Sequence, residues 1–328
     1  MSGEHRQGRV RAADASATSV ASTTSGASGA VKKKSGINWN AIIAAVLILV
    51  GLSVLLYPVL ATEWNNRMQQ QAADAYAKIE QSTPPEVLNK SWEEAHRYNA
   101  ETGQVEIIDA WTGVVDETTP EYRRYRNYLS QLAGTEAMGQ IAIPAIDSNL
   151  PIFHGTSDAV LSKGVGHLYG TDLPVGGVDR HAVLSAHTGI PTATLWDNLV
   201  DLKVGDVFYI AVAGKKLKYE IHDVSVVLPH ESDGLARVAG QDLVTLITCT
   251  PYGINSHRLL VTGHQVPMDP VEESVFEETG MRWQWWMWAI VAAAILTLLI
   301  TLRWVWVLRR KSREDDNRGV AEDVVAGD

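Results

Sequence analysis

The chain has a single cysteine, Cys249, among its 328 residues. One thiol excludes a framework of disulfides, and it equally excludes a zinc or iron–sulfur site built from cysteines. The ten histidines do not replace such a site, because no HExxH motif or matching carboxylate spacing occurs. The sequence therefore predicts neither a metal site nor a cofactor.

Basic residues are outnumbered, with 28 Lys and Arg against 38 Asp and Glu, which gives a net charge of −10 at pH 7. The acidic excess lies in the centre of the chain, since residues 1–36 are basic on balance and residues 303–328 carry equal numbers of both signs. An acidic centre lacks the basic footprint of a nucleic-acid surface. We therefore expect no nucleic acid among the partners.

Two stretches contain no charged residue: 37–61 and 285–302. The first exceeds the ~20 apolar residues that cross a bilayer, and tryptophans flank the second at both ends, as in an interfacial belt. Lysines 32–34 precede the first stretch, and basic residues 309–311 follow the second. By the positive-inside rule, both termini are cytoplasmic and residues 62–284 lie on the extracytoplasmic face.

The first apolar stretch has a second interpretation, a signal peptide that is cleaved after Ala61. Its apolar run is longer than the ~7–15 residues of a usual signal core, which favours an uncleaved helix. Both interpretations place the centre of the chain outside the cytoplasm. The Ser-, Thr-, Ala- and Gly-rich tract 1–36 and the polar tail after Arg313 are predicted to be disordered.

Residues 62–134 carry helical periodicity interrupted by one long loop. The apolar stripe that predicts the first helix consists of Trp64, Met68, Ala72, Tyr76 and Ile79. A second helical pattern runs from Val87 to about Ala100, and a third ends at Gly134. Residues 103–120 fit neither helix nor strand, and unstructured loops of this length are often lids or binding loops.

Residues 135–270 change to short segments with strand periodicity. The segments are IAIPAI, LPIFHG, HAVLSAHT, VFYIAVAGKKLKYEIHDVSVV, LVTLITC and RLLVTGHQV. Six or more short strands at regular spacing favour a closed β-barrel over a parallel α/β sheet.

Cys249 ends an apolar strand and is followed by Pro251, so the thiol lies at a strand end and not at a helix start. A lone thiol is more often a buried packing residue than a nucleophile. Two neighbours favour chemistry here: Arg258 begins the next strand after a hairpin-like connection, and His187 ends another strand. Thiol, imidazole and guanidinium are the groups that acyl transfer requires.

Two segments carry a resemblance to a known family. They are TLITCTPYGINSHRLLVTGH (245–264) and SAHTGIPTATLWDNL (185–199), and they resemble the class C, or pilin-polymerising, branch of the sortases. The resemblance implies that Cys249 is the nucleophile, His187 the proton donor and acceptor, and Arg258 the stabiliser of the oxyanion or substrate. It also implies a barrel of about eight strands with the site at strand ends.

The reaction implied is cleavage of a Leu-Pro-x-Thr-Gly-like sorting signal between Thr and Gly through a thioacyl enzyme. A lysine amine of a pilin subunit then resolves the thioester, so the implied partners are pilins and other surface proteins with sorting signals. Class C sortases resemble one another in a lid with an Asp-Pro-aromatic motif. Here Asp109-Ala110-Trp111 has the acid and the ring without the proline, so Asp109 is expected to pair with Arg258 and Trp111 to cover Cys249.

Two other functions stay open on the sequence. A housekeeping sortase would attach surface proteins to peptidoglycan, and a barrel without enzymatic activity would only bind them. The 103–120 loop and the second apolar stretch favour the pilin-polymerising type, and the complete Cys, His and Arg set argues against a pure binder. The fold class expected is a closed sortase-type β-barrel with N-terminal helices and a lid loop, flanked by two transmembrane helices.

The predicted organisation has seven segments. They are a cytoplasmic tail (1–36), a transmembrane helix (37–61), a helical region with the lid loop (62–134), the catalytic barrel (135–270), a juxtamembrane linker (271–284), a transmembrane helix (285–302) and a cytoplasmic tail (303–328).

Overall fold

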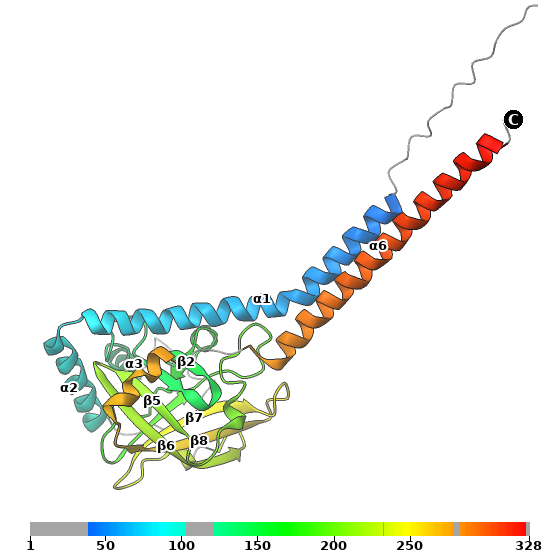
Figure 1. Cartoon of the computed structure of the whole chain (residues 1–328). Helices are drawn as coiled ribbons and strands as arrows, with labels where there is room; N and C mark the ends of the chain where they lie inside the picture. Colours follow the sequence, from blue (N-terminus) through cyan, green and yellow to red (C-terminus); the bar gives the residue numbers. More distant parts are fainter. Residues whose placement is uncertain (1–38, 103–120, 232, 279–282, 326–328) are drawn as a thin grey trace, which may run out of the picture. The chain divides into compact units, whose positions relative to one another are not determined.

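Eight strands close into a barrel in the order β1–β2–β3–β4–β7–β8–β6–β5 (Figure 1). The structure, a computed structural model, describes residues 39–102, 121–231, 233–278 and 283–325. The strands are β1 (Gly139–Ile143), β2 (Ser148–His154), β3 (Val165–His167), β4 (Arg180–Ser185), β5 (Val207–Val212), β6 (Lys215–Val227), β7 (Asp242–Thr250) and β8 (His257–Val266). The closed barrel predicted from the strand spacing is confirmed.

Most neighbouring strands are antiparallel, but β2 pairs with β3 and β4 pairs with β7 in parallel. A parallel pair requires a crossover connection, so its two strands are distant in sequence while their ends lie at the same edge of the barrel. The barrel interior is filled by large apolar side chains. They include Ile141, Leu150, Leu184, Trp196, Phe208, Ile210, Tyr219, Val244, Leu246 and Val261.

Two strand predictions differ from the structure. The segment IAIPAI was expected to be one strand, but β1 ends at Ile143 and a 3-10 turn covers Pro144–Ile146. Proline has no backbone N–H to donate to a ladder, and its fixed φ suits the first position of a helical turn. Strand β3 was not predicted, because its three residues are too few to show an alternating pattern.

The first helix, α1 (Trp39–Ser82), continues without a break from the apolar stretch into the polar region that follows it. It ends at the Ser-Thr-Pro-Pro sequence, as expected. Helix α2 (Pro85–Glu101) then begins with a proline at its first position, where a missing N–H costs nothing. Helix α3 (Glu121–Leu129) precedes the barrel.

The helix predicted from the apolar stripe is confirmed, but most members of the stripe are exposed and do not form the buried face of α1. Trp64 is 69% exposed, Met68 49% and Ile79 45%. Beyond the apolar stretch the buried side chains of α1 are Thr62, Asn66, Gln69, Ala73 and Tyr76. Hydrophobic periodicity could not predict this face, because its contacts are made mainly by small and polar side chains that hydrogen-bond to loops of the barrel.

Within the part of the chain that the structure describes, two helices are long and apolar enough to cross a membrane: α1 and the apolar part of α6 (Trp285–Val325). Helix α6 continues to Val325, so the expectation that the polar tail after Arg313 is disordered is wrong. Its polar continuation contains no proline and many residues of high helix propensity, such as Arg, Glu and Ala. Between barrel and α6, Phe276 of α5 (Val275–Glu278) packs on Tyr209.

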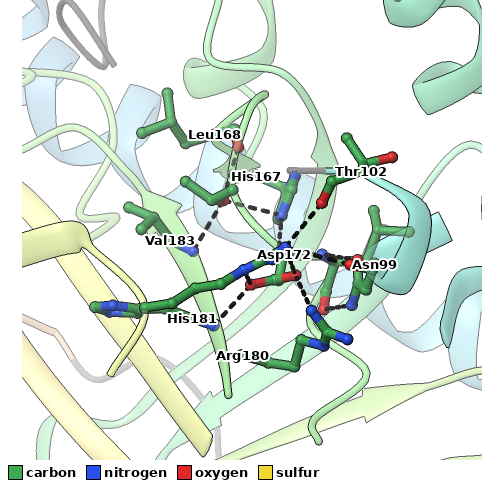
Figure 2. Close-up of polar contacts among 11 residues, drawn as sticks. Asn99, Thr102, His167, Leu168, Asp172, Arg180, His181 and Val183 are labelled. Atoms are coloured by element: carbon green, nitrogen blue, oxygen red, sulfur yellow. Dashed lines mark hydrogen bonds and ion pairs between the residues drawn. The ribbon is translucent and has the colours of Figure 1, made fainter. Parts of the chain in front are cut away.

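A buried carboxylate joins the end of α2 to the barrel (Figure 2). Asp172 lies between β3 and β4, its side chain is fully buried, and it accepts a hydrogen bond from the backbone N–H of His181. Arg237, which precedes β7, binds Asp172 and also donates to the backbone carbonyls of Asn99 and Thr102. These carbonyls belong to the last turn of α2, where a cation is favourable.

Candidate active site

Cys249 and Arg258 are direct partners across the antiparallel pair of β7 and β8. Directly opposite residues of such a pair have their side chains on the same face with Cβ atoms about 4.5–5.5 Å apart. The hairpin predicted from the spacing of Cys249, Pro251 and Arg258 is therefore confirmed. It places the guanidinium beside the thiol on one face of the sheet.

His187 reaches the same level of the barrel from the other side of β7. In the parallel pair, Ser185 of β4 lies opposite Ile247 of β7. The ladder continues one residue further, where the N–H of Ala186 donates to the carbonyl of Ile247 at 3.2 Å and the Thr248 hydroxyl donates to the carbonyl of Ala186 at 2.8 Å. The next residues on the two strands are His187 and Cys249.

All three side chains belong to the outer face of the barrel. Successive residues of a strand point to opposite faces, and Ala186 packs in the interior cluster, which turns His187 outward. One row below, Ile247 and Leu260 lie in a small apolar cluster outside the barrel, together with Val183 and with Leu235 of the β6–β7 connection. Cys249 and Arg258 share strand parity with Ile247 and Leu260, and therefore share this outer face.

Each candidate group is half-buried, which suits chemistry that needs both solvent exclusion and access. The Arg258 guanidinium is oriented by its own turn, since Nη1 donates to the carbonyls of Asn255 at 3.4 Å and His257 at 3.3 Å. Burial lowers the pKa of His187 below its ordinary 6.5, with a smaller opposing effect of the Asp158 charge. Burial thus favours the neutral imidazole in the unreacted site.

The turn after His187 is held by Asp197. One carboxylate oxygen accepts from the backbone N–H of Gly189 at 2.7 Å and from the hydroxyl of Thr188 at 3.0 Å. Burial raises the pKa of Asp197, and these two hydrogen bonds oppose the rise. Trp196 adds a backbone bond from its N–H to the carbonyl of His187 at 3.2 Å. The segment that follows His187 therefore folds back on it.

Residues 141–266 match the sequence model of the Sortase domain family. The crystal structure of sortase C-1 from Actinomyces oris is 51% identical and superposes with a TM-score of 0.53, over 56% of this chain and 99% of that one. The chain belongs to the sortase family. Sortases are cysteine transpeptidases, and the Thr-Leu-Ile-Thr-Cys segment that ends β7 lies inside the matched region.

Two further relatives of this sortase carry different names. The pilus-related Sortase C of Group B Streptococcus is 38% identical with a TM-score of 0.53, over 61% of this chain and 97% of that one. Sortase A of Streptococcus agalactiae serotype III (strain NEM316) is 33% identical over 116 residues, which are 34% of this chain and 47% of that protein. The chain thus spans about half the length of this Sortase A.

The structure does not bear on every predicted site residue of this sortase. Asp109 and Trp111 fall in 103–120, outside the described residues, so their expected place over Cys249 stays a prediction. Among the other histidines, His154, His167 and His181 are satisfied by hydrogen bonds within the fold. Within the described residues, no group of three or more His, Cys, Asp or Glu is arranged to hold a metal ion.

Sequence reasoning gave no role to Asp197, although it lies within the quoted segment 185–199. Its contact with Gly189 depends on how the chain folds back after β4, and an Asp-Asn pair ten residues beyond a histidine has no recognisable spacing rule. The same is true of the α1 side chains that contact this segment, which are described below.

Proposed function

We propose that this sortase is a class C enzyme that joins a cleaved sorting signal to a lysine amine of a pilin subunit. The observation that carries the proposal is the row of His187, two residues past the end of β4, Cys249 near the end of β7 and Arg258 near the start of β8. The row supplies a nucleophile, an acid–base group and a cation in one place. Cleavage falls between Thr and Gly of a Leu-Pro-x-Thr-Gly-like signal.

The reaction has two acyl-transfer steps. The Cys249 thiolate attacks the threonine carbonyl, and the Arg258 guanidinium stabilises the oxyanion that forms. His187 gives its proton to the departing glycine amine, so a peptide bond breaks and a thioester forms. In the second step the lysine amine attacks the thioester, His187 accepts the proton, and Sγ leaves as an amide bond forms. No external energy source is needed, because one amide replaces another.

The neutral ground state of His187 bears on the rate of the first step. Because burial lowers the pKa of His187 and so favours its neutral form, we infer that the thiolate–imidazolium pair that reacts is a minority form of the site. A minority reactive pair suits a slow ligase that must prefer an amine over water.

Several observations support the pilin type over the housekeeping type. The structural relatives include a pilus-related sortase C, the chain has a second helix long enough to cross a membrane, and the 103–120 loop matches the position of a lid in the sequence. The housekeeping alternative has support in the similarity to a Sortase A. In that case the acceptor would be a cell-wall cross-bridge amine.

The charges at the helix ends support a location with both termini in the cytoplasm and the barrel on the extracytoplasmic face. Lysines 32–34 precede the first apolar stretch and basic residues 309–311 follow the second, which is the distribution of the positive-inside rule. Sorting-signal proteins would meet the barrel after their own export.

The test uses the full chain in lipid nanodiscs with a Leu-Pro-x-Thr-Gly peptide, and mass spectrometry follows the products. Two acceptors compete in the same reaction: a peptide with an internal lysine, and an oligoglycine amine. We expect the thioester on Cys249 and a predominant lysine-linked product, with no product for Cys249→Ala. A thioester resolved mainly by oligoglycine would favour the housekeeping type. Absence of any thioester would contradict the transpeptidase itself.

A further inference from the structure

Helix α1 contacts the segment that follows His187 immediately beyond its membrane-crossing stretch. The Thr62 hydroxyl donates to the carbonyl of Pro191 at 3.2 Å, and the Asn65 side-chain amide donates to the carbonyl of Thr192 at 2.8 Å. Both acceptors are backbone atoms, so the contacts fix the path of the chain. The segment 188–198 connects β4 to the 3-10 turn Leu199–Asp201 and has no strand neighbours to fix it over this length.

Asn66 forms two hydrogen bonds with a single residue of this segment, Thr194. Its Nδ2 donates to the Thr194 hydroxyl at 2.9 Å, and its Oδ1 accepts from the Thr194 backbone N–H at 3.1 Å. The two residues are 7% and 5% exposed. A buried donor or acceptor left without a partner costs about 1–3 kcal/mol. Replacing Asn66 therefore leaves the polar atoms of Thr194 unsatisfied and favours a different position of the segment.

The segment returns to His187 two residues after Thr194. The N–H of Trp196 donates to the His187 carbonyl, and the fully buried Trp196 ring packs in the barrel interior. A chain of bonded contacts therefore leads from Asn66 through Thr194 and Trp196 to the backbone of His187. This contact helps to fix the backbone of His187, which lies two residues past the end of β4.

We propose that Asn66 is a positioning residue for the transpeptidation reaction, acting through Thr194 to hold His187 at the level of Cys249. This rests on the proposed roles of His187 and Cys249, and it adds that the anchoring helix is part of the active-site scaffold. Asn66 lies only five residues beyond the end of the predicted first membrane span at Ala61. The helix thereby links the site directly to the membrane anchor.

The proposal is tested with the full chain in nanodiscs carrying Asn66→Ala, and Arg67→Ala is the matched control. Arg67 is the next residue on α1, its side chain is 72% exposed, and the ion pair it makes is with Glu63 of the same helix. Misplacing a catalytic group by about 1 Å can cost on the order of 100-fold in rate. We expect Asn66→Ala to lower kcat by about 10- to 100-fold with little change in KM, and Arg67→Ala to match the wild type.

A second pair of variants separates positioning from packing. Thr194→Val keeps the shape and the backbone N–H but removes the hydroxyl, whereas Thr194→Ser keeps the hydroxyl. Loss of kcat in the valine variant and recovery in the serine variant would support the proposal. If Asn66→Ala and Thr194→Val lower Tm but leave kcat unchanged, the contact only stabilises the fold and the proposal is overturned.

A substrate-free readout keeps this test apart from the proposed function. Cys249 is the only thiol in the chain, so its alkylation rate as a function of pH reports its coupling to His187 without any peptide. We expect Asn66→Ala and Thr194→Val to change this profile and Arg67→Ala to leave it unchanged. Wild-type protein that forms no thioester would contradict the proposed function, whereas an unaltered profile in the variants would contradict the role of Asn66 alone.

Discussion

Asp172 and Arg237 form a two-pronged ion pair in which Nε donates to Oδ2 at 2.7 Å and Nη2 donates to Oδ1 at 2.6 Å. The Asp172 side chain is fully buried, while the Arg237 side chain is 26% exposed. A planar guanidinium matches both oxygens of a carboxylate at once, which a lysine ammonium cannot do. Because Arg237 also binds the last carbonyls of α2, the pair holds together three parts of the chain that are distant in sequence.

The first prediction is that Asp172→Asn destabilises the barrel severely. The substitution removes the negative charge that Arg237 binds at 2.6 Å and that Arg180 Nη1 approaches to 3.8 Å, and it leaves both cations in place. Breaking a buried ion pair by removing one partner costs about 3–5 kcal/mol. The measurement is the free energy of unfolding of the full chain in detergent.

The control for this variant is an exposed ion pair in the same protein. Lys163 and Glu136 are 3.0 Å apart with side chains 61% and 76% exposed, and exposed pairs contribute about 0–1 kcal/mol. Glu136→Gln should therefore be nearly neutral. Equal losses of unfolding free energy for Asp172→Asn and Glu136→Gln would show that the buried ion pair contributes no more to stability than the exposed one.

The sequence predicted the part of the site that depends on local geometry. Cys249 and Arg258 are nine residues apart with Pro251 and Gly253 between them, so a hairpin was the natural connection, and β7 and β8 form it. His187 is 62 residues from Cys249, and its level was set by the parallel pairing of β4 with β7. No spacing rule predicts such a register. The sequence selected His187 as a polar group at a strand end, and the resemblance to sortases supplied its role as proton donor and acceptor.

The contacts of α1 could not be predicted for a different reason. The buried face of the helix presents Thr62 and Asn66, whose energy comes from hydrogen bonds to one particular loop and not from apolar burial. A search for apolar periodicity selected Trp64 and Met68, which are exposed. Only the folded position of segment 188–198 shows what these polar side chains bind.

The second prediction concerns the expected lid and follows from the sequence alone. If Asp109 pairs with Arg258 and Trp111 covers Cys249, either Asp109→Ala or Trp111→Ala shifts the balance toward the open form. The alkylation rate of Cys249 should then rise several-fold. Ala110 leaves the backbone freer than the family's proline would, so Ala110→Pro should slow the same reaction. Glu93→Ala, on an exposed position of α2, serves as the control, and rates that stay equal in all variants would weaken the class C assignment.

The third prediction is that Arg258→Lys remains badly impaired although it keeps the positive charge. An ammonium cannot reproduce the two parallel donors of a guanidinium, and loss of one oxyanion donor costs about 10²–10³ in turnover. The measurement is kcat for lysine-linked product, with Arg97→Lys on the exposed face of α2 as the control. Near-normal turnover by Arg258→Lys would mean that the guanidinium has a structural role only.

The fourth prediction is a loss of stability in mild acid that depends on His167. This histidine is fully buried, its Nε2–H donates to the carbonyl of Asp172 at 2.7 Å, and its Nδ1 accepts from the Tyr128 hydroxyl at 2.9 Å. The Tyr128 oxygen in turn accepts from the backbone N–H of Gly155 at 2.9 Å. The neutral ring is therefore satisfied at both nitrogens. The Tyr128 hydroxyl also lies 3.0 Å from the His167 carbonyl, to which it can donate, so the cost of a proton at Nδ1 comes mainly from burying the charged ring.

Burial lowers the pKa of His167 from 6.5 to about 4. Between these two values the unfolded chain binds a proton that the folded chain does not, so stability falls as the pH falls below 6.5 and the loss is complete near pH 4. One such group changes the free energy of unfolding by about 1.4 kcal/mol per pH unit. From pH 7 to pH 5 its share is about 2 kcal/mol, because the change begins only near 6.5.

Urea unfolding of the full chain at pH 7 and pH 5 measures this share. His167→Gln should be less stable than the wild type at pH 7 but should lose about 2 kcal/mol less on acidification. The other buried histidines, such as His154 and His181, titrate in both proteins and cancel in the comparison. His230→Gln changes an exposed histidine and should leave the acid sensitivity of the wild type intact. If His167→Gln loses as much stability as the wild type between these pH values, the buried imidazole is not the group that carries the acid sensitivity.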